Sequence, residues 1–465
     1  MEGIYVFMQK SKLKIALVGA GSFSFGRAMI DDIYLSDALN DVGIDLWLMD
    51  ISEEYLVERQ KYARTVAGLL NRAPNVFFTT DLHTALHDAD FVITAIEVNR
   101  HLHWAQDFHI PRQYGFMQIY GENGGPGGIF HALRNMEPMV QIARRMEELC
   151  PNAVLINFSN PESKLCQAVT MLTKIRTFGL CHGAMDGVKQ IASLLQMPIE
   201  ELDAKACGIN HFTWFQTICR KKNGEDLYPL LRKKEKLAEP LAHWDEMALN
   251  RICFRVFGLY PSPAANHIGE YIRWAHEFLA TSSFQYYYDP VDGHPWETGK
   301  IPQFVYSLIE RPTEKPLFYS KNSDETSEKE SSINKETLKA SGELAVPLIE
   351  SLVCGIKHEL YAVNVQNKGS IPGIDDDIIV EVPATTDGKE IFPWQLERLP
   401  EAITAMLRLQ GSIQKLVVEA YIEKSRHKLL QAILLDPTVN SYRNAVGLIN
   451  EMYALQKDVL PHMEW

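Results

Sequence analysis

The sequence lacks the long apolar run that a membrane-spanning helix requires, because no stretch approaches about 18 apolar residues. It also lacks the order of charge, apolar core and small residues that marks a secretory signal peptide, since its N-terminus has only a short apolar run before the lysines. The seven cysteines are odd in number and scattered along the chain, which excludes an obvious disulfide framework. We therefore expect a soluble protein of the reducing cytoplasm.

An excess of basic residues is absent as well. The chain has 46 Lys and Arg against 59 Asp and Glu, a net charge of −13. This balance argues against nucleic acid or an anionic membrane surface as the main partner. It leaves an anionic small substrate possible, because a local pocket can oppose the global charge. At 465 residues the chain is too long for one hydrophobic core, so we expect two domains or one elaborated α/β domain.

Short apolar runs alternate with helical patterns through the first 180 residues, which predicts a parallel sheet. The expected strands are Lys14–Val18, Asp45–Met49, Val76–Thr79, Phe91–Ile96, Ala153–Phe158 and Thr177–Leu180. The predicted fold class is α/β, with a doubly wound Rossmann sheet in residues 1–185. Helical patterns dominate after residue 185, with an exposed polar segment at 320–339 and a late strand at Asp377–Val382. We expect residues 186–465 to form an α+β domain for substrate, metal and oligomerisation.

A glycine-rich turn directly follows the first expected strand. In LVGAGSFSFG (17–26), Gly19 permits a tight turn and Gly21 lets the backbone approach a pyrophosphate at a helix N-terminus. Ser24 stands where the third glycine of the fingerprint belongs. Asp50 ends the second strand, where an acid binds the ribose hydroxyls of NAD and disfavours the 2′-phosphate of NADP. We predict an NAD site with contacts from Gly19, Gly21, Ser22, Phe23, Asp50 and Asn160.

Three further stretches fall where the ligand edge of such a sheet should be. INFSNPES (156–163) brings Asn160, GLCHGAMDG (179–187) brings Cys181 and His182, and GINHFTWF (208–215) brings His211. A thiolate and an imidazole from separate segments can hold a divalent metal and leave positions open for substrate oxygens. A lone cysteine or histidine is more often structural, but together at strand ends the pair favours a metal site.

These motifs, taken in order, resemble glycoside hydrolase family 4, the NAD- and manganese-dependent glycosidases related in fold to lactate and malate dehydrogenases. The resemblance runs through most of the chain and includes the glycine turn, YGENGGPGGIFHALRN (120–135), Asn-Pro, Cys-His-Gly, Asn-His, HIGEY (267–271) and NKGSIPG…VEVP (367–383). The family departs from the usual hydrolysis by two carboxylates. The resemblance implies oxidation of sugar carbon 3 by NAD, loss of the carbon-2 proton, elimination of the leaving group, addition of water and return of the hydride.

The resemblance also implies roles for individual residues. Cys181 and His211 would bind Mn²⁺ or another divalent metal, Asn160 would touch substrate and cofactor, and His182 would act as the general acid. Tyr260, His267 and Tyr271 are the candidates for the carbon-2 base, with His267 or Tyr271 favoured. Arg134 is expected to face substrate or a cofactor phosphate, while His131 stands where many relatives have Arg. A homodimer or homotetramer is expected from the resemblance.

The tetrapeptide Cys181-His182-Gly183-Ala184 is similar to that of the family's α-glucuronidases. It favours an α-linked uronic acid as substrate, a glucuronide first and a galacturonide second, whose carboxylate would need a cation such as Arg134, Lys368 or Arg273. An α-glucosidase, an α-galactosidase or a sulfoquinovosidase of the same family stays open. Outside the family, the alternatives are a 2-hydroxyacid dehydrogenase, which would not need the metal-binding cysteine, and an inactive NAD-binding sensor.

Overall fold

The first half of the chain forms the parallel part of one large sheet. The computed structural model describes residues 12–22, 25–238, 247–278, 284–287, 304–307 and 334–465, and in it this sheet has twelve strands. Its parallel strands are β1 (Leu13–Val18), β2 (Ile44–Met49), β3 (Val76–Thr79), β4 (Phe91–Thr94), β5 (Val154–Asn157) and β6 (Arg176–Gly179). They lie in the order β3-β2-β1-β4-β5-β6. This is the doubly wound Rossmann order, so the predicted fold class is confirmed.

The six parallel strands lie within two residues of their predicted bounds. All four residues of β4 and all four of β5 are buried, as expected where helices cover both faces of a parallel sheet. The helices between these strands are α1 (Gly26–Leu35), α2 (Asp37–Val42), α3 (Glu53–Leu69), α4 (Leu82–Leu86), α5 (Arg100–Gln113), α6 (Gly125–Leu149) and α7 (Glu162–Leu172). The carboxyl ends of the strands face the second half of the chain.

The second half contains more strand than the sequence predicts. Its strands in the main sheet are β7 (Leu202–Ile209), β8 (Phe212–Arg220), β9 (Pro261–Ser262), β12 (Glu359–Gln366), β13 (Ile379–Thr386) and β14 (Ile391–Pro393). They continue the sheet beyond β6 in the order β12-β13-β7-β8-β9, antiparallel, with β14 beside β13. The expected late strand corresponds to β13. A separate antiparallel pair joins β10 (Phe284–Tyr287) to β11 (Phe304–Ser307).

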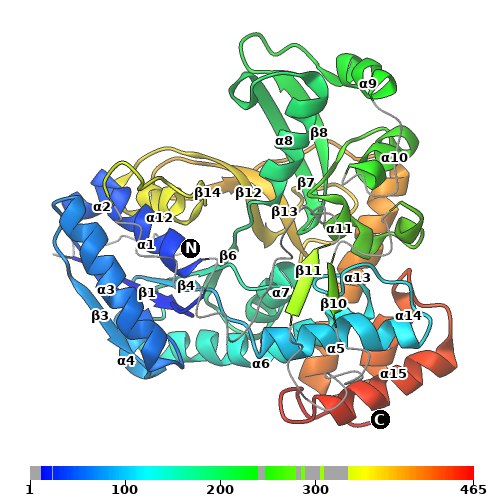
Figure 1. Ribbon diagram of the computed structural model, residues 1–465, viewed down its shortest axis with the longest axis horizontal. Coiled ribbons are helices and arrows are strands. Elements are labelled where there is room, and N and C mark those ends of the chain that lie inside the picture. Colours follow the sequence, from blue (N-terminus) through cyan, green and yellow to red (C-terminus); the bar gives the residue numbers. More distant parts are fainter. Residues whose placement is uncertain (1–11, 23–24, 239–246, 279–283, 288–303, 308–333) are drawn as a thin grey trace.

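The second half also contains helices. They are α8 (Gly183–Leu195), α9 (Tyr228–Leu237), α10 (Ala248–Phe257), α11 (Ala265–Ile268), α12 (Ala345–Cys354), α13 (Glu401–Glu423), α14 (Arg426–Leu435) and α15 (Tyr442–Leu455), with short 3-10 turns η1 (Ile199–Glu201), η2 (Gly269–Tyr271) and η3 (Ala275–Glu277). Figure 1 shows α13, α14 and α15 gathered beside α5 and α6, so the C-terminal helices pack on the first half of the chain.

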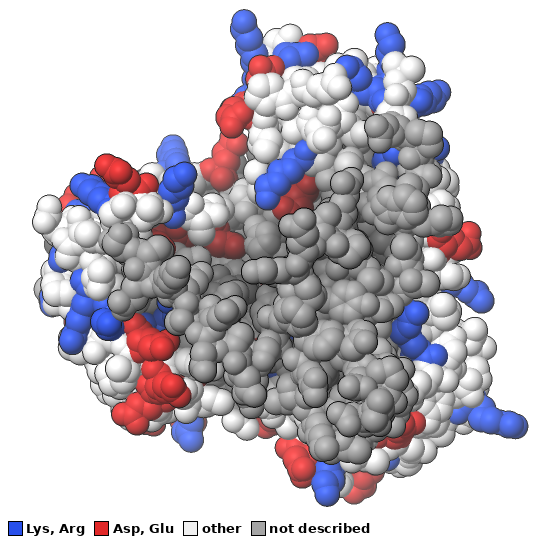
Figure 2. Space-filling view, viewed as in Figure 1, with Lys and Arg blue, Asp and Glu red and all other residues white. Residues whose placement is uncertain are grey.

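The surface of the described residues carries charges of both signs. On the face drawn in Figure 2, basic and acidic side chains alternate around the rim. Of the polar segment expected at 320–339, residues 320–333 lie outside the described part, and 334–339 are mostly exposed. Among the described residues, every helix is too short or too polar to cross a membrane.

Arg134 corrects one expectation. Its guanidinium lies inside the protein, not at a ligand site, and donates to both carboxylate oxygens of Asp107 at 2.6 and 3.3 Å, with both side chains 0 % exposed. Gln456, just after α15, completes the group by accepting from Arg134 at 2.8 Å and donating to Asp107 at 3.0 Å. The sequence cannot reveal this role, because the partners come from α5 and from a segment over 300 residues away. Arg134 therefore joins α5, α6 and the C-terminal helices.

We predict that Arg134→Met lowers the free energy of unfolding by about 3–5 kcal/mol, because it leaves the Asp107 carboxylate buried without its cation. Arg145 on the same helix is the matched control: its pair with Glu148 is more than half exposed, so Arg145→Met should cost less than about 1 kcal/mol. Denaturant unfolding followed by circular dichroism measures both. Equal midpoints for the two variants would contradict the structural role of Arg134.

Candidate functional site

The glycine turn after β1 has the geometry that a bound dinucleotide needs. Gly19 has a φ of +86°, and a side chain there would meet the carbonyl oxygen of Ala95 at 2.3 Å. The backbone N–H of Gly21 donates to Asp50 Oδ2 at 2.8 Å, which ties the turn to the end of β2. Gly26 begins α1, and a Cβ there would lie 2.2 Å from the Ala20 carbonyl oxygen. Gly26 thus provides the close helix–strand approach of the missing third glycine.

Other expected cofactor contacts lie around the same turn. The Ser22 N–H donates to the Gly19 carbonyl, and Ser22 Oγ accepts from the N–H of Phe25 at 3.3 Å. Phe23 lies outside the described residues. Asn160 follows β5 and is joined to Pro161 by a cis peptide bond. Its carbonyl accepts from Asn135 Nδ2 on α6 at 2.9 Å, which fixes the chain beyond the strand end.

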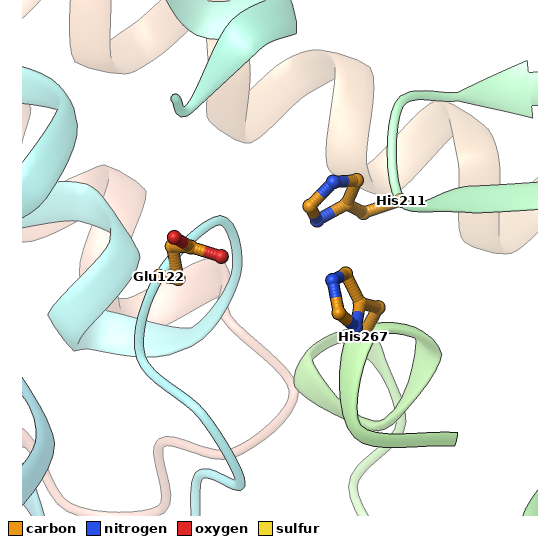
Figure 3. A group of neighbouring side chains, drawn as sticks. All are labelled: Glu122, His211 and His267. Atoms are coloured by element: carbon orange, nitrogen blue, oxygen red, sulfur yellow. The ribbon is translucent and has the colours of Figure 1, made fainter. Parts of the chain in front are cut away.

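Three possible metal ligands converge where the loop before α6, the β7–β8 turn and α11 meet (Figure 3). One donor atom each from Glu122, His211 and His267 lies within 4.8 Å of the others. His211 occupies the two-residue turn with a φ of 65°, and its ring centroid lies 4.4 Å from that of His267. Burial lowers the pKa of both imidazoles, which favours the neutral form that binds metals. We call this the histidine group.

Hydrogen bonds hold each member of the histidine group. Asn123 Nδ2 donates to His211 Nδ1 at 2.9 Å. His267 Nδ1 donates to Asn266 Oδ1 at 2.8 Å, which directs Nε2 toward the group. The Glu122 carboxylate accepts from Arg100 at 2.5 Å.

A second set of donors surrounds Cys181, which follows β6. Donor atoms of Cys181, Glu162 on α7 and Glu381 on β13 lie within 4.8 Å of one another. Asn364 Nδ2 on β12 donates to Glu162 at 2.6 Å and to Glu381 at 3.0 Å, so one amide links the two carboxylates. Burial, with Glu162 and Glu381 nearby, raises the pKa of the Cys181 thiol well above its usual value. We call this the cysteine group.

The two groups meet at Asn210. Its Nδ2 donates to Glu381 at 2.7 Å and its side chain contacts Cys181, while the next residue is His211. No group of three described donors contains both predicted ligands, so Cys181 and His211 belong to adjoining groups. The buried Oδ1 atoms of Asn210 and Asn364 have no hydrogen-bond partner among the described residues. Thiol, imidazole and carboxylate donors with unsatisfied amide oxygens beside them fit a bound divalent cation.

His182 stands at the N-cap of α8, next to Cys181, with its side chain 55 % exposed. Its Nδ1 donates to Glu343 Oε1 at 2.9 Å. This bond, more than any other cause, raises the pKa of His182. Glu343 lies in the polar stretch before α12, where the sequence offers no motif to single it out.

The three candidates for a base differ in position. His267 belongs to the histidine group. Tyr271 is buried, its hydroxyl donates to the Asn210 carbonyl at 3.2 Å, and burial near Glu270 raises its pKa well above the ordinary value. The Tyr260 hydroxyl donates to Gln190 on α8 at 3.0 Å. Of the three, His267 has the position closest to the other candidate ligands.

Several site residues were not singled out from the sequence although they lie within its motifs. Glu122 is part of YGENGGPGG, Glu162 of INFSNPES and Glu381 of VEVP. Glu270, from HIGEY, accepts from the N–H groups of Glu122 and Asn123 at 2.6 and 2.9 Å, and burial raises its pKa to about 8. The signal that could have identified these residues is an acidic side chain inside an otherwise apolar or glycine-rich motif.

Two basic side chains beyond the expected ones lie at the site. Lys164 on α7 is buried, its Nζ donates to the Asn123 carbonyl at 2.5 Å, and burial lowers its pKa to about 8. Arg100 is one third exposed and bridges Glu97 and Glu122. The His131 ring lies between the Glu97 carboxylate, 2.8 Å from Nε2, and the Glu122 carbonyl, 2.7 Å from Nδ1. Lys368 and Arg273, the other expected cations, are exposed.

Proteins of known activity are similar to this chain over nearly its whole length. An α-glucosidase of Erwinia rhapontici is 30 % identical, covering 97 % of this chain and 99 % of the relative. An α-galacturonidase of Thermoanaerobacter italicus is 28 % identical, covering 96 % and 97 %. Among solved structures, a 6-phospho-α-glucosidase from gut microorganisms, in complex with NAD and Mn²⁺, has a TM-score of 0.74 at 22 % identity, covering 97 % of this chain and 100 % of that one.

Two family descriptions together match most of the chain. Residues 14–197 match the family 4 glycosyl hydrolases, and residues 206–439 match the C-terminal domain of the same family. The matched regions contain the glycine turn, both groups of candidate metal ligands and His182. The chain belongs to family 4 of the glycosyl hydrolases.

Proposed function

We propose that the protein is an α-glycosidase that depends on NAD and on a divalent metal such as Mn²⁺. One observation carries the proposal: two groups of candidate metal-binding side chains adjoin at Asn210. The sheet that positions them also has, after β1, the glycine turn of a dinucleotide-binding fold. A 2-hydroxyacid dehydrogenase would need the turn but not the thiol and its carboxylates. Membership of family 4 and a solved relative with NAD and Mn²⁺ support the same conclusion.

The residues divide the work by position. When bound, NAD would take a hydride from sugar carbon 3 and return it, and the metal would polarise the carbon-3 oxygen. Cys181 and His211 would hold the metal, and each has a carboxylate of its own group within 4.8 Å, Glu381 for Cys181 and Glu122 for His211. His267 would remove the carbon-2 proton and His182 would protonate the leaving oxygen. Asn160 would orient substrate beside the nicotinamide.

We propose an α-linked uronic acid as the sugar at the non-reducing end. The tetrapeptide at 181–184 supports this choice, as does the relative named α-galacturonidase. Because Arg134 is enclosed with Asp107, we assign the carboxylate contact to Arg100, whose guanidinium is one third exposed beside Glu122 of the histidine group. Neutral α-glucosides and α-galactosides are the alternatives, since relatives bear those names.

The cofactor assignment predicts a preference for NAD over NADP. Asp50→Ala should narrow that preference by about 1–3 kcal/mol, because the ribose hydroxyls lose an acceptor. Titration calorimetry with both cofactors measures it. Asp45 lies on β2, just before Asp50, and pairs with Lys12. Asp45→Ala is therefore the matched control and should change neither affinity. Equal affinities of the unaltered protein for NAD and NADP would refute the role of Asp50.

The metal assignment predicts that Cys181→Ser, His211→Ala and chelation each abolish turnover while NAD still binds. Added Mn²⁺ should restore the chelated protein but not the variants, because they lack a ligand. Mn²⁺ affinity is followed by electron paramagnetic resonance of the free ion. Cys219→Ser and His276→Ala, which change residues outside both groups, are the controls. Normal Mn²⁺ affinity in Cys181→Ser would remove Cys181 from the metal site.

The sugar assignment predicts that aryl α-glucuronide or α-galacturonide is cleaved faster than the matching neutral hexoside, by roughly 2–4 kcal/mol in kcat/KM if the ion pair is desolvated. Arg100→Ala should remove most of this preference. A sulfoquinovoside belongs in the same assay, because a sulfonate could use the same cation. A neutral hexoside cleaved faster than both uronides would overturn the assignment, and loss of the preference in Arg273→Ala or Lys368→Ala would move the contact away from Arg100.

A further inference from the structure

We propose that Glu343 is the positioning residue for His182, holding its imidazole in the orientation that delivers a proton to the leaving oxygen. The inference rests on the proposed glycosidase function, because it assigns the support of that function's acid. It concerns a residue outside every motif of the sequence. It also assigns a function to the segment that precedes α12.

The two partners differ in how firmly they are held. The His182 side chain is 55 % exposed at the start of α8, where an imidazole would otherwise turn freely. Glu343 is only 9 % exposed and accepts the His182 Nδ1–H at 2.9 Å. Its second oxygen, Oε2, is buried and has no hydrogen-bond partner among the described residues. Burying a carboxylate costs free energy unless it is hydrogen-bonded, and the partner of this one among the described residues is His182.

The backbone around Glu343 is fastened on two sides. The Ser341 N–H donates to Asp32 Oδ1 at 2.7 Å and the Ser341 hydroxyl donates to Asp32 Oδ2, which anchors the segment to α1. The Glu343 N–H donates to Ser341 Oγ at 3.1 Å. On the other side, the Tyr361 hydroxyl on β12 donates to the Gly342 carbonyl at 3.3 Å. Glu343 is therefore the fixed partner, and His182 takes its orientation from it.

A carboxylate at Nδ1 has a defined effect on the opposite ring nitrogen. It keeps the Nδ1 proton in place and fixes the orientation of the ring, so that Nε2 faces away from Glu343. When the bond between sugar carbon 1 and the leaving oxygen breaks, that oxygen keeps the electron pair and takes the Nε2 proton. The imidazole is left neutral, with its remaining proton still donated to Glu343. A poor leaving group needs this proton, whereas nitrophenolate does not.

The experiment compares two leaving groups on the α-sugar that the unaltered enzyme accepts. Glu343→Gln should slow cleavage of the methyl glycoside by about tenfold more than that of the p-nitrophenyl glycoside, as for a weakened general acid. In deuterated water, methyl glycoside recovered from the variant should carry more deuterium at carbon 2 per cleavage event, because proton removal continues while departure stalls. Glu336→Gln, an exposed glutamate on the same segment, should match the unaltered enzyme.

A cycle of variants separates positioning from general stability. If Glu343 acts through His182, Glu343→Gln should slow the His182→Ala enzyme no further. The NAD affinity and melting temperature of the Glu343→Gln enzyme should equal those of the Glu336→Gln enzyme. Should Glu343→Gln fail to fold, Ser341→Ala, which loosens the anchor to Asp32, is expected to give a smaller change with the same dependence on the leaving group.

Other results would overturn the inference. Equal slowing on both glycosides, or a further loss when Glu343→Gln is added to His182→Ala, would make Glu343 a structural residue only. Failure of the proposed function would look different, because the unaltered enzyme would then cleave neither glycoside in the presence of NAD and Mn²⁺.

Discussion

A glycine faces a polar residue at two strand pairings, one where the parallel and antiparallel parts of the sheet meet and one inside the antiparallel part. Gly179 on β6 pairs with Asn364 on β12, and Gly208 on β7 pairs with Glu381 on β13. A Cβ at Gly179 would lie 2.3 Å from Glu162 Oε1, so only glycine leaves room for the carboxylate. Buried amides and carboxylates are tolerated only when they hydrogen-bond one another, and here they do so across the junction. The constraint that joins the two parts of the sheet therefore also places the cysteine group.

The site concentrates negative charge around few cations. The basic side chains there are Lys164 and Arg100. They are outnumbered by the glutamates that lie in or beside the two groups of donors: Glu97, Glu122, Glu162, Glu270 and Glu381. Burial raises the pKa of both Glu162 and Glu381, and the neighbouring carboxylates of Glu381 and Glu343 add to the rise at Glu162. A divalent cation is the simplest group that relieves such crowding, and it would do so between residues drawn from both parts of the sheet.

The sequence predicts the parallel strands well because each is a short, almost wholly apolar run between turn residues. After residue 185 it predicts the strand that corresponds to β13 and misses the others in the described part, for two physical reasons. In β8 an apolar run of buried residues resembles a helix core as much as a strand, and in β12 a buried Asn364 interrupts the alternation. At the site, Cys181, His182, His211 and Asn160 stand at strand ends or tight turns, so their placement follows from the fold. Arg134 and Glu343 depend on distant partners that no local pattern reveals, because Gln456 lies 322 residues after Arg134 and His182 lies 161 residues before Glu343.

The Arg134 group has a consequence for how the protein matures during synthesis. Asp107 and Arg134 belong to the nucleotide-binding part, yet the amide that satisfies them both is on Gln456, 322 residues after Arg134. A ribosome releases the chain from its N-terminus, so Asp107 and Arg134 emerge well before the amide that hydrogen-bonds to both. The hydrogen bonds of this buried pair are therefore complete only once the residues that are translated last are in place.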